Sequence, residues 1–76
     1  MEPAEAYDSI SIKRLNADMG RKEAWQKALD LYSLIPFAKT PQEKDDIMRR
    51  ATEQMKICHD FTQIVWECDD KLGRLE

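Results

Sequence analysis

The stretch Thr40-Pro41-Gln42-Glu43 decides the fold of this 76-residue chain, because its residues together meet the requirements of a helix start. Thr40 can cap a helix, Pro41 suits the first helical position, and Glu43 can reach back towards the cap. Pro36 lies just upstream and cannot continue a helix. We therefore expect residues 36–40 to form a tight connection between two helices.

The apolar pattern after Pro41 is the most regular in the chain. Apolar residues recur at alternating steps of four and three, as in a helix that packs along one seam, with a single polar interruption. The seam positions are Ile47, Ala51, Gln54, Cys58, Phe61, Val65, Cys68 and Leu72. This pattern predicts a helix over 41–72, about 48 Å long at 1.5 Å per residue.

A second helix is predicted over 21–35, antiparallel to the helix over 41–72. Its core positions are expected to be Ala24, Ala28, Leu31 and Ile35. Three large residues lie beside them on one flank, namely Trp25, Leu29 and Tyr32. Because small residues let two backbones approach closely, Ala24 and Ala28 are expected to face Ala51 and Cys58.

A short N-terminal helix is expected over 8–19, with Ile12, Leu15 and Met19 as its apolar residues. Residues 9–12 also alternate with a period of two, so an extended arm is the alternative. The three-four spacing of this segment does not continue in phase into 21–35, so a break is expected near Gly20, a residue suited to helix ends. We therefore predict an all-α, antiparallel three-helix bundle, with residues 1–7 as a frayed arm.

Length and composition indicate a single helical domain over 1–76. The net charge of −3 argues against direct nucleic-acid binding, which requires a basic surface. Two cysteines and the absence of a signal-like start favour a reducing, cytoplasmic location, and no apolar stretch is long enough to span a membrane. The C-terminal Leu75-Glu76 resembles a cloning-site remnant and carries no weight.

Catalysis and metal binding are not expected. Cys58, His59 and Cys68 are residue types that bind zinc, but neighbours on a helix point about 100° apart, and Cys68 lies about 15 Å from Cys58 along the axis. His59 is the single histidine and no glycine-rich turn accompanies it, so a thiol nucleophile has no oriented base. We expect no enzyme, no cofactor and two free thiols.

The apolar sector of the helix over 41–72 is about 200° wide, which exceeds what one neighbouring helix buries. The flank formed by Met48, Met55 and Trp66 is therefore the predicted partner-binding surface. The alternative is that the other two helices of the bundle bury both flanks of this sector. The expected function is non-catalytic protein–protein interaction, as an adaptor, regulatory or chaperone-like subunit that binds a protein or forms an oligomer. The alternative is a small helical cofactor or regulator of a nucleic-acid-processing machine, acting partly through Lys13, Arg14, Arg21 and Lys22.

Two partial resemblances concern helical binding modules. Ala24, Ala28, Leu31 and Tyr32 resemble the alanine-rich stretch of microtubule-interacting-and-transport domains, which are three-helix adaptors that bind peptide helices in a groove. The small helical cofactor of coronavirus replicases is similar at Trp25, Leu31, Ile35, Ala38, Lys39, Glu43 and Met48. Each resemblance covers under a third of the chain and implies a binding module without catalysis of its own. We assign the chain to neither family.

Overall fold

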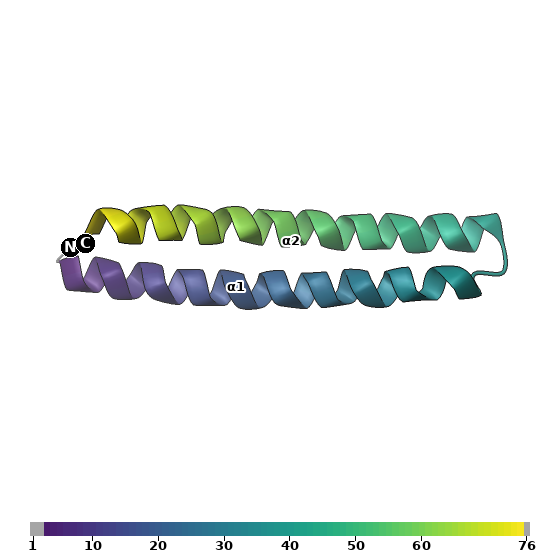
Figure 1. The fold of residues 1–76 in the computed structure, drawn as a ribbon, viewed down its shortest axis with the longest axis horizontal. Coiled ribbons are helices and arrows are strands. Elements are labelled where there is room, and N and C mark those ends of the chain that lie inside the picture. The colour runs from purple at the N-terminus through teal and green to yellow at the C-terminus, as the bar shows by residue number, and fades with distance from the viewer. Residues whose placement is uncertain (1–2, 76) are drawn as a thin grey trace.

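The computed structural model describes residues 3–75, which form an antiparallel helical hairpin (Figure 1). Helix α1 (Pro3–Leu34) leads through a short 3-10 turn, η1 (Ile35–Phe37), into helix α2 (Pro41–Leu75). The two helices lie side by side over their whole length, so the molecule is a rod of 57 × 15 × 13 Å. The all-α class is confirmed. Met1, Glu2 and Glu76 lie outside the described residues, and so do the parts of the expected arm and cloning remnant that fall on them.

The prediction of a three-helix bundle is wrong, because residues 8–19 and 21–35 belong to one continuous helix. Residues 3–7, expected as a frayed arm, form the start of the same helix. Ile12, Leu15 and Met19, the expected core of a separate helix, are all exposed.

The three-helix prediction failed because it assigned the wrong residues of 8–19 to the side that faces the neighbouring helix. Ala28, Ala24 and Ala17 of α1 are buried. They lie on a seam whose positions alternate at steps of four and three residues, as in α2. Arg21 and Arg14 stand at the intervening positions of that seam. An arginine can bury its aliphatic stem and keep its charged head in water, so it fills a seam position that a hydrophobic pattern does not reveal.

Small residues line the contact between the helices. Ala28 and Ala51 are completely buried, and Ala24 is nearly so, as expected from the sequence, whereas Cys58 is half-buried. No large side chain is fully buried among the described residues. Among the residues whose burial the structure describes, six are buried, namely Ala17, Ala24, Ala28, Ala51, Val65 and Cys68.

Gly20 lies in the middle of α1, and the expected break is absent there. Phe61 of α2 explains the glycine. A Cβ atom added to Gly20 would lie 2.7–3.0 Å from three atoms of the Phe61 ring, which is closer than carbon atoms pack. Gly20 therefore makes room for an aromatic ring of the other helix.

The connection between the helices follows the sequence-based expectation. Thr40 Oγ1 accepts a hydrogen bond from the Glu43 N–H at 3.1 Å, which caps α2. Glu43 Oε2 accepts a hydrogen bond from the Lys39 N–H at 2.8 Å, one residue before the cap. The two side chains thus satisfy backbone donors on both sides of the helix start, and Pro41 occupies the first helical position.

We expect Thr40→Ala to lower the free energy of unfolding by about 0.5–2 kcal/mol, because the Glu43 N–H loses its acceptor. Urea unfolding followed by circular dichroism measures the change. An unchanged midpoint would show that this cap does not contribute to stability.

We expect Gly20→Ala to lower the free energy of unfolding by up to about 2 kcal/mol, because overpacking against Phe61 costs about 1–3 kcal/mol and outweighs the gain in helix propensity of about 1 kcal/mol. Gly73→Ala is the matched control, since nothing lies within 4 Å of its added Cβ. That variant should gain a few tenths to about 1 kcal/mol. Equal stabilisation by both substitutions would contradict the close contact.

Candidate protein-binding face

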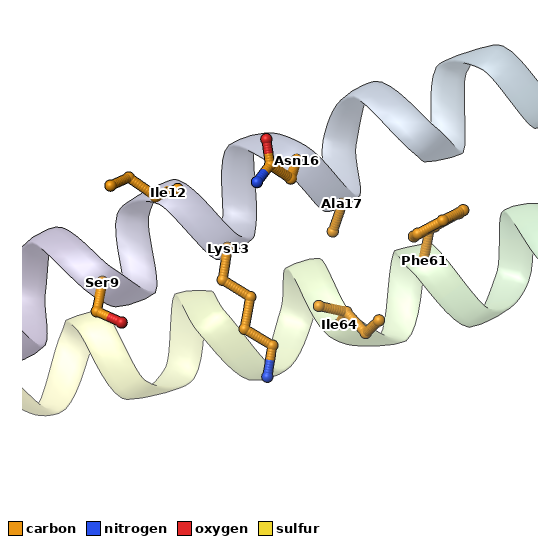
Figure 2. Close-up of a pocket in the computed structure, with 7 residues that line it drawn as sticks. All are labelled: Ser9, Ile12, Lys13, Asn16, Ala17, Phe61 and Ile64. Carbon is orange, nitrogen blue, oxygen red and sulfur yellow. The ribbon is translucent and has the colours of Figure 1, made fainter.

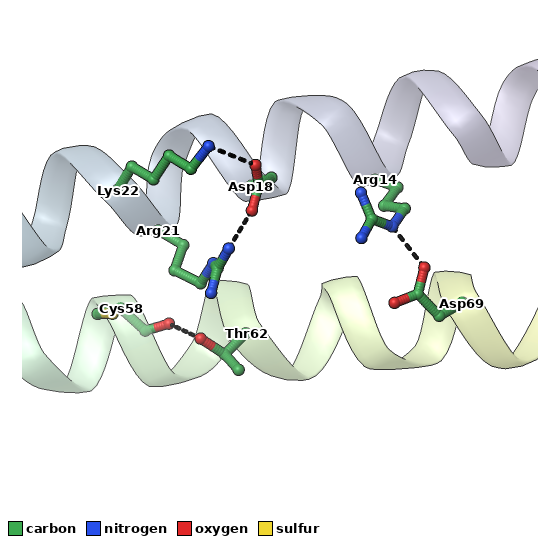
Figure 3. Close-up of polar contacts among 7 residues, drawn as sticks. All are labelled: Arg14, Asp18, Arg21, Lys22, Cys58, Thr62 and Asp69. Carbon is green, nitrogen blue, oxygen red and sulfur yellow. Dashed lines mark hydrogen bonds and ion pairs between the residues drawn. The ribbon is translucent and has the colours of Figure 1, made fainter.

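A groove marks one long side of the hairpin, between α1 and α2. Its volume is about 460 Å³. The groove lies near the middle of the rod, where the Cys58 and Thr62 region of α2 is opposite the Arg21 region of α1 (Figure 3). Its lining residues are Arg21, Lys22, Trp25, Gln26, Cys58 and Thr62.

Further residues can be placed on this side of the hairpin from the helical repeat. Seven residues make about two turns, so residues seven apart lie on nearly the same face of a helix. On α1, Tyr32 shares a face with Trp25. On α2, Met55 and Met48 share a face with Thr62, and Trp66 lies one turn beyond it. Leu15 and Leu29 lie two turns on either side of Lys22. We call this surface the tryptophan face, formed by Leu15, Trp25, Leu29, Tyr32, Met48, Met55 and Trp66.

The large apolar side chains of the tryptophan face are not covered by the rest of the chain. Trp66 is 60% exposed and Met48 is 45% exposed, whereas Met55 is half-buried. Leu15, Trp25, Leu29 and Tyr32 are exposed as well. The structure thus places the three residues of the predicted partner-binding flank on one side of the hairpin, together with aromatic and leucine residues of α1.

The residues of α1 were the part of this face that the sequence analysis did not assign to a site. Trp25, Leu29 and Tyr32 were recognised as a flank, but a third helix was expected to cover apolar surface on the bundle. Leu15 was assigned to the core of that third helix. The unusual width of the apolar sector of residues 21–35, about 220°, was the signal that could have identified them.

Charged residues near the groove are joined in ion pairs (Figure 3). Arg14 of α1 donates a hydrogen bond to Asp69 of α2, which links the two helices. Asp18 accepts a hydrogen bond from Arg21 and forms a second ion pair with Lys22 at 3.1 Å. Each of these three cations therefore has a carboxylate neighbour, and two carboxylates serve all three.

These pairs shift the titration of their members. Hydrogen bonds from Arg21 and Lys22 lower the pKa of Asp18 below its usual value, because they favour the carboxylate. The hydrogen bond to Asp69, together with its negative charge, raises the pKa of Arg14. The Nε atom of Arg21 is buried and has no hydrogen-bond partner among the described residues. The head group of Arg21 is thus anchored on one side only.

Three of the four basic residues considered for a nucleic-acid-related role are therefore paired with acids. These are Arg14, Arg21 and Lys22. The fourth, Lys13, lies on the other side of the hairpin, where it lines a second groove. The structure divides the four residues between two sides, and the carboxylates of Asp18 and Asp69 offset two of their four positive charges.

The second groove has a volume of about 390 Å³ and lies towards the end of the hairpin where α1 begins (Figure 2). Ile12, Ile64 and Phe61 provide much of its apolar surface, with Lys13 across its opening. A third, shallower groove continues this side and is lined partly by Gly20 and Ile57. We call this side the isoleucine face, formed by Ile12, Lys13, Ile57, Phe61 and Ile64.

The thiols and the imidazole do not converge. Cys68 is buried, Cys58 is half-buried, and both thiols are free. His59 is exposed, and its Nε2 lies 3.4 Å from the side-chain nitrogen of Gln63. Over the described residues, no group of three or more His, Cys, Asp or Glu residues is arranged to hold a metal ion.

No model of a known protein family matches this sequence, and no curated protein or solved structure shows significant similarity to it. Within residues 3–75, neither helix is apolar enough over a sufficient length to cross a membrane.

Acid should remove the contribution of Asp18 to stability. Since its pKa is lower in the folded state, Asp18 stabilises the fold above its unfolded pKa of about 3.9, and this contribution is lost as the pH falls through the folded pKa. We expect Asp18→Asn to lower the midpoint of thermal unfolding near neutral pH, and the difference from the parent to close below about pH 4.

The matched control is Asp60→Asn, which removes an exposed carboxylate of α2 that forms no ion pair with the described residues. Thermal unfolding followed by circular dichroism across the acid range compares the three proteins. A difference between Asp18→Asn and the parent that persists at the lowest pH would contradict the ion-pair explanation.

Proposed function

We propose that this chain is a non-catalytic protein–protein interaction module, acting as an adaptor, regulatory or chaperone-like subunit through its tryptophan face. The observation that carries the proposal is the exposure of large apolar side chains from both helices on one side of the hairpin. Monomeric proteins rarely expose apolar surfaces of this kind unless they bind something.

The composition of the face supports a protein partner. Tryptophan and tyrosine are enriched among residues that dominate binding energy, because each contributes a large area with few rotatable bonds. Methionine adapts its shape to different partners, because its side chain is unbranched and polarisable. Trp25 and Trp66 therefore suit the role of anchors, with Met48 and Met55 as adaptable neighbours.

The shape of the surface supports the same function. The groove beside Trp25 is open and lies on a rod-like scaffold in which both helices continue past it. Anchors on regular helices keep fixed positions relative to one another, because the backbone hydrogen bonds hold the helices straight. A partner would thus meet a preformed apolar strip rather than an enclosed pocket.

We expect Trp66→Ala to weaken association with a protein partner, or with another copy of the chain, by about 2 kcal/mol or more. The fold should be disturbed less than by Val65→Ala, because Trp66 is exposed and Val65 is buried. Association is measured by quantitative capture on the immobilised protein, and the fold by circular dichroism.

Ile12→Ala is the matched control for exposure, since Ile12 and Trp66 are each 60% exposed. Ile12 lines the groove of the isoleucine face, outside the tryptophan face, so its truncation should leave capture unchanged. Equal capture by the parent, Trp66→Ala and Ile12→Ala would contradict the proposal.

A further inference from the structure

We propose that the partner of the tryptophan face is a second copy of this chain, and that Trp66 of each copy inserts into the groove beside Trp25 of the other. The result is a symmetric four-helix assembly with both tryptophan faces inside. This inference rests on the proposed function, because it assigns an occupant to the same surface.

The surface area of the chain supports association with another copy. A folded monomer of 8.9 kDa exposes about 4,800 Å² on the usual scaling, whereas this chain exposes 5880 Å². The excess is about 1,100 Å², and a stable interface buries about 800 Å² on each partner. One interface of ordinary size would therefore bring this chain to the exposure of a typical folded protein.

The shape and core lead to the same conclusion. The radius of gyration is 17.2 Å, against about 11 Å for a compact domain of this length. The contact between α1 and α2 buries mostly alanine, with no large side chain fully covered among the described residues. Small domains need further burial for stability, and pairing two hairpins supplies it by covering the aromatic residues.

The tryptophan face is complementary to itself, as a two-fold symmetric interface requires. The groove centres near residue 60 of α2, and Trp66 lies six residues further on, which is about 9 Å along the helix. A two-fold axis that crosses the face midway between them places Trp66 of each copy over the groove of the other. Both insertions then occur at once, and the two hairpins run antiparallel.

The chemistry of the groove suits an indole ring. Its volume of about 460 Å³ is within the range of sites that enclose large organic groups. Trp25 offers an aromatic wall, while Arg21 and Lys22 offer cations that attract the face of an aromatic ring. An aromatic side chain therefore suits this groove better than an acidic or aliphatic one.

Charge favours the tryptophan face over the isoleucine face for this contact. Arg14, Arg21 and Lys22 each contact a carboxylate, with Asp18 shared by two of them, so none of these cations is left without an acidic neighbour when two copies approach. On the isoleucine face, Lys13 lies across the groove and forms no ion pair with the described residues. Burying that ammonium against a second copy would carry a desolvation penalty.

Sedimentation of the whole chain across a range of concentrations tests the inference, with circular dichroism recorded on each sample. We expect a species of twice 8.9 kDa. Trp66→Ala should raise the dissociation constant by at least about 30-fold, as expected for an anchor residue. Ile12→Ala should leave it within about twofold, because Ile12 is equally exposed but lies on the isoleucine face.

A second variant blocks the groove and leaves the anchor intact. Thr62→Phe places a ring at the groove wall and should weaken self-association to a similar extent. Mixing Trp66→Ala with Thr62→Phe should then restore association. In the mixed dimer, the intact Trp66 of the Thr62→Phe chain enters the open groove of the Trp66→Ala chain. The filled groove of the Thr62→Phe chain faces only the truncated residue 66. If Trp66→Ala is poorly folded, Thr62→Phe alone tests the insertion, and the mixing experiment applies when circular dichroism shows both variants to be folded.

The outcomes separate this inference from the proposed function. A chain that stays at 8.9 kDa but captures another protein in a Trp66-dependent manner overturns the second copy and keeps the interaction module. A dimer that is weakened by Ile12→Ala and not by Trp66→Ala overturns the assigned face. A dimer that Thr62→Phe does not weaken, or two variants that fail to complement, overturns the insertion into the groove.

Discussion

The close approach of α1 and α2 along a line of alanine residues is the constraint on which the rest of this structure depends. Ala28 and Ala51 have no exposed surface, and Gly20 leaves space for the ring of Phe61. A seam this narrow has no room for large side chains, because interiors are packed at the density of a crystal. Trp25, Trp66, Tyr32, Met48 and Met55 therefore lie on the sides of the hairpin, and the two apolar faces arise from the same cause as the tight core.

The polar half of the seam has a different role. Arg14 and Arg21 occupy positions where an aliphatic residue would add to the core, and both remain partly exposed. The contact of Arg14 with Asp69 joins the two helices at one register. Both groups are substantially exposed, so the pair adds little stability, but sliding one helix along the other would separate it. Alignment of the hairpin and stability of the hairpin thus come from different residues.

The candidate site shows which features of a binding surface can be predicted from the sequence of one helix. The width of the apolar sector around Met48, Met55 and Trp66 predicted that one neighbouring helix would not cover it, and these residues do remain at the surface or partly so. Which residues of α1 lie beside them was not predicted, because that depends on the phase of α1 against α2. Trp25 lies on this face because of how α1 is rotated relative to α2. The sequence pattern of one helix does not specify that rotation.

The sequence by itself determined the helical class, the position of the connection and the start of α2, because capping at Thr40 and the three-four repeat are local properties of neighbouring residues. The tertiary structure decided that residues 3–34 form one helix and that Ile12 and Met19 face outward. The physical reason is that Arg14 and Arg21 are polar in a sequence pattern but act as seam residues once an adjacent helix covers their stems. Likewise, Gly20 indicates a helix end in the sequence, and only the position of the Phe61 ring shows why a glycine is needed within the helix.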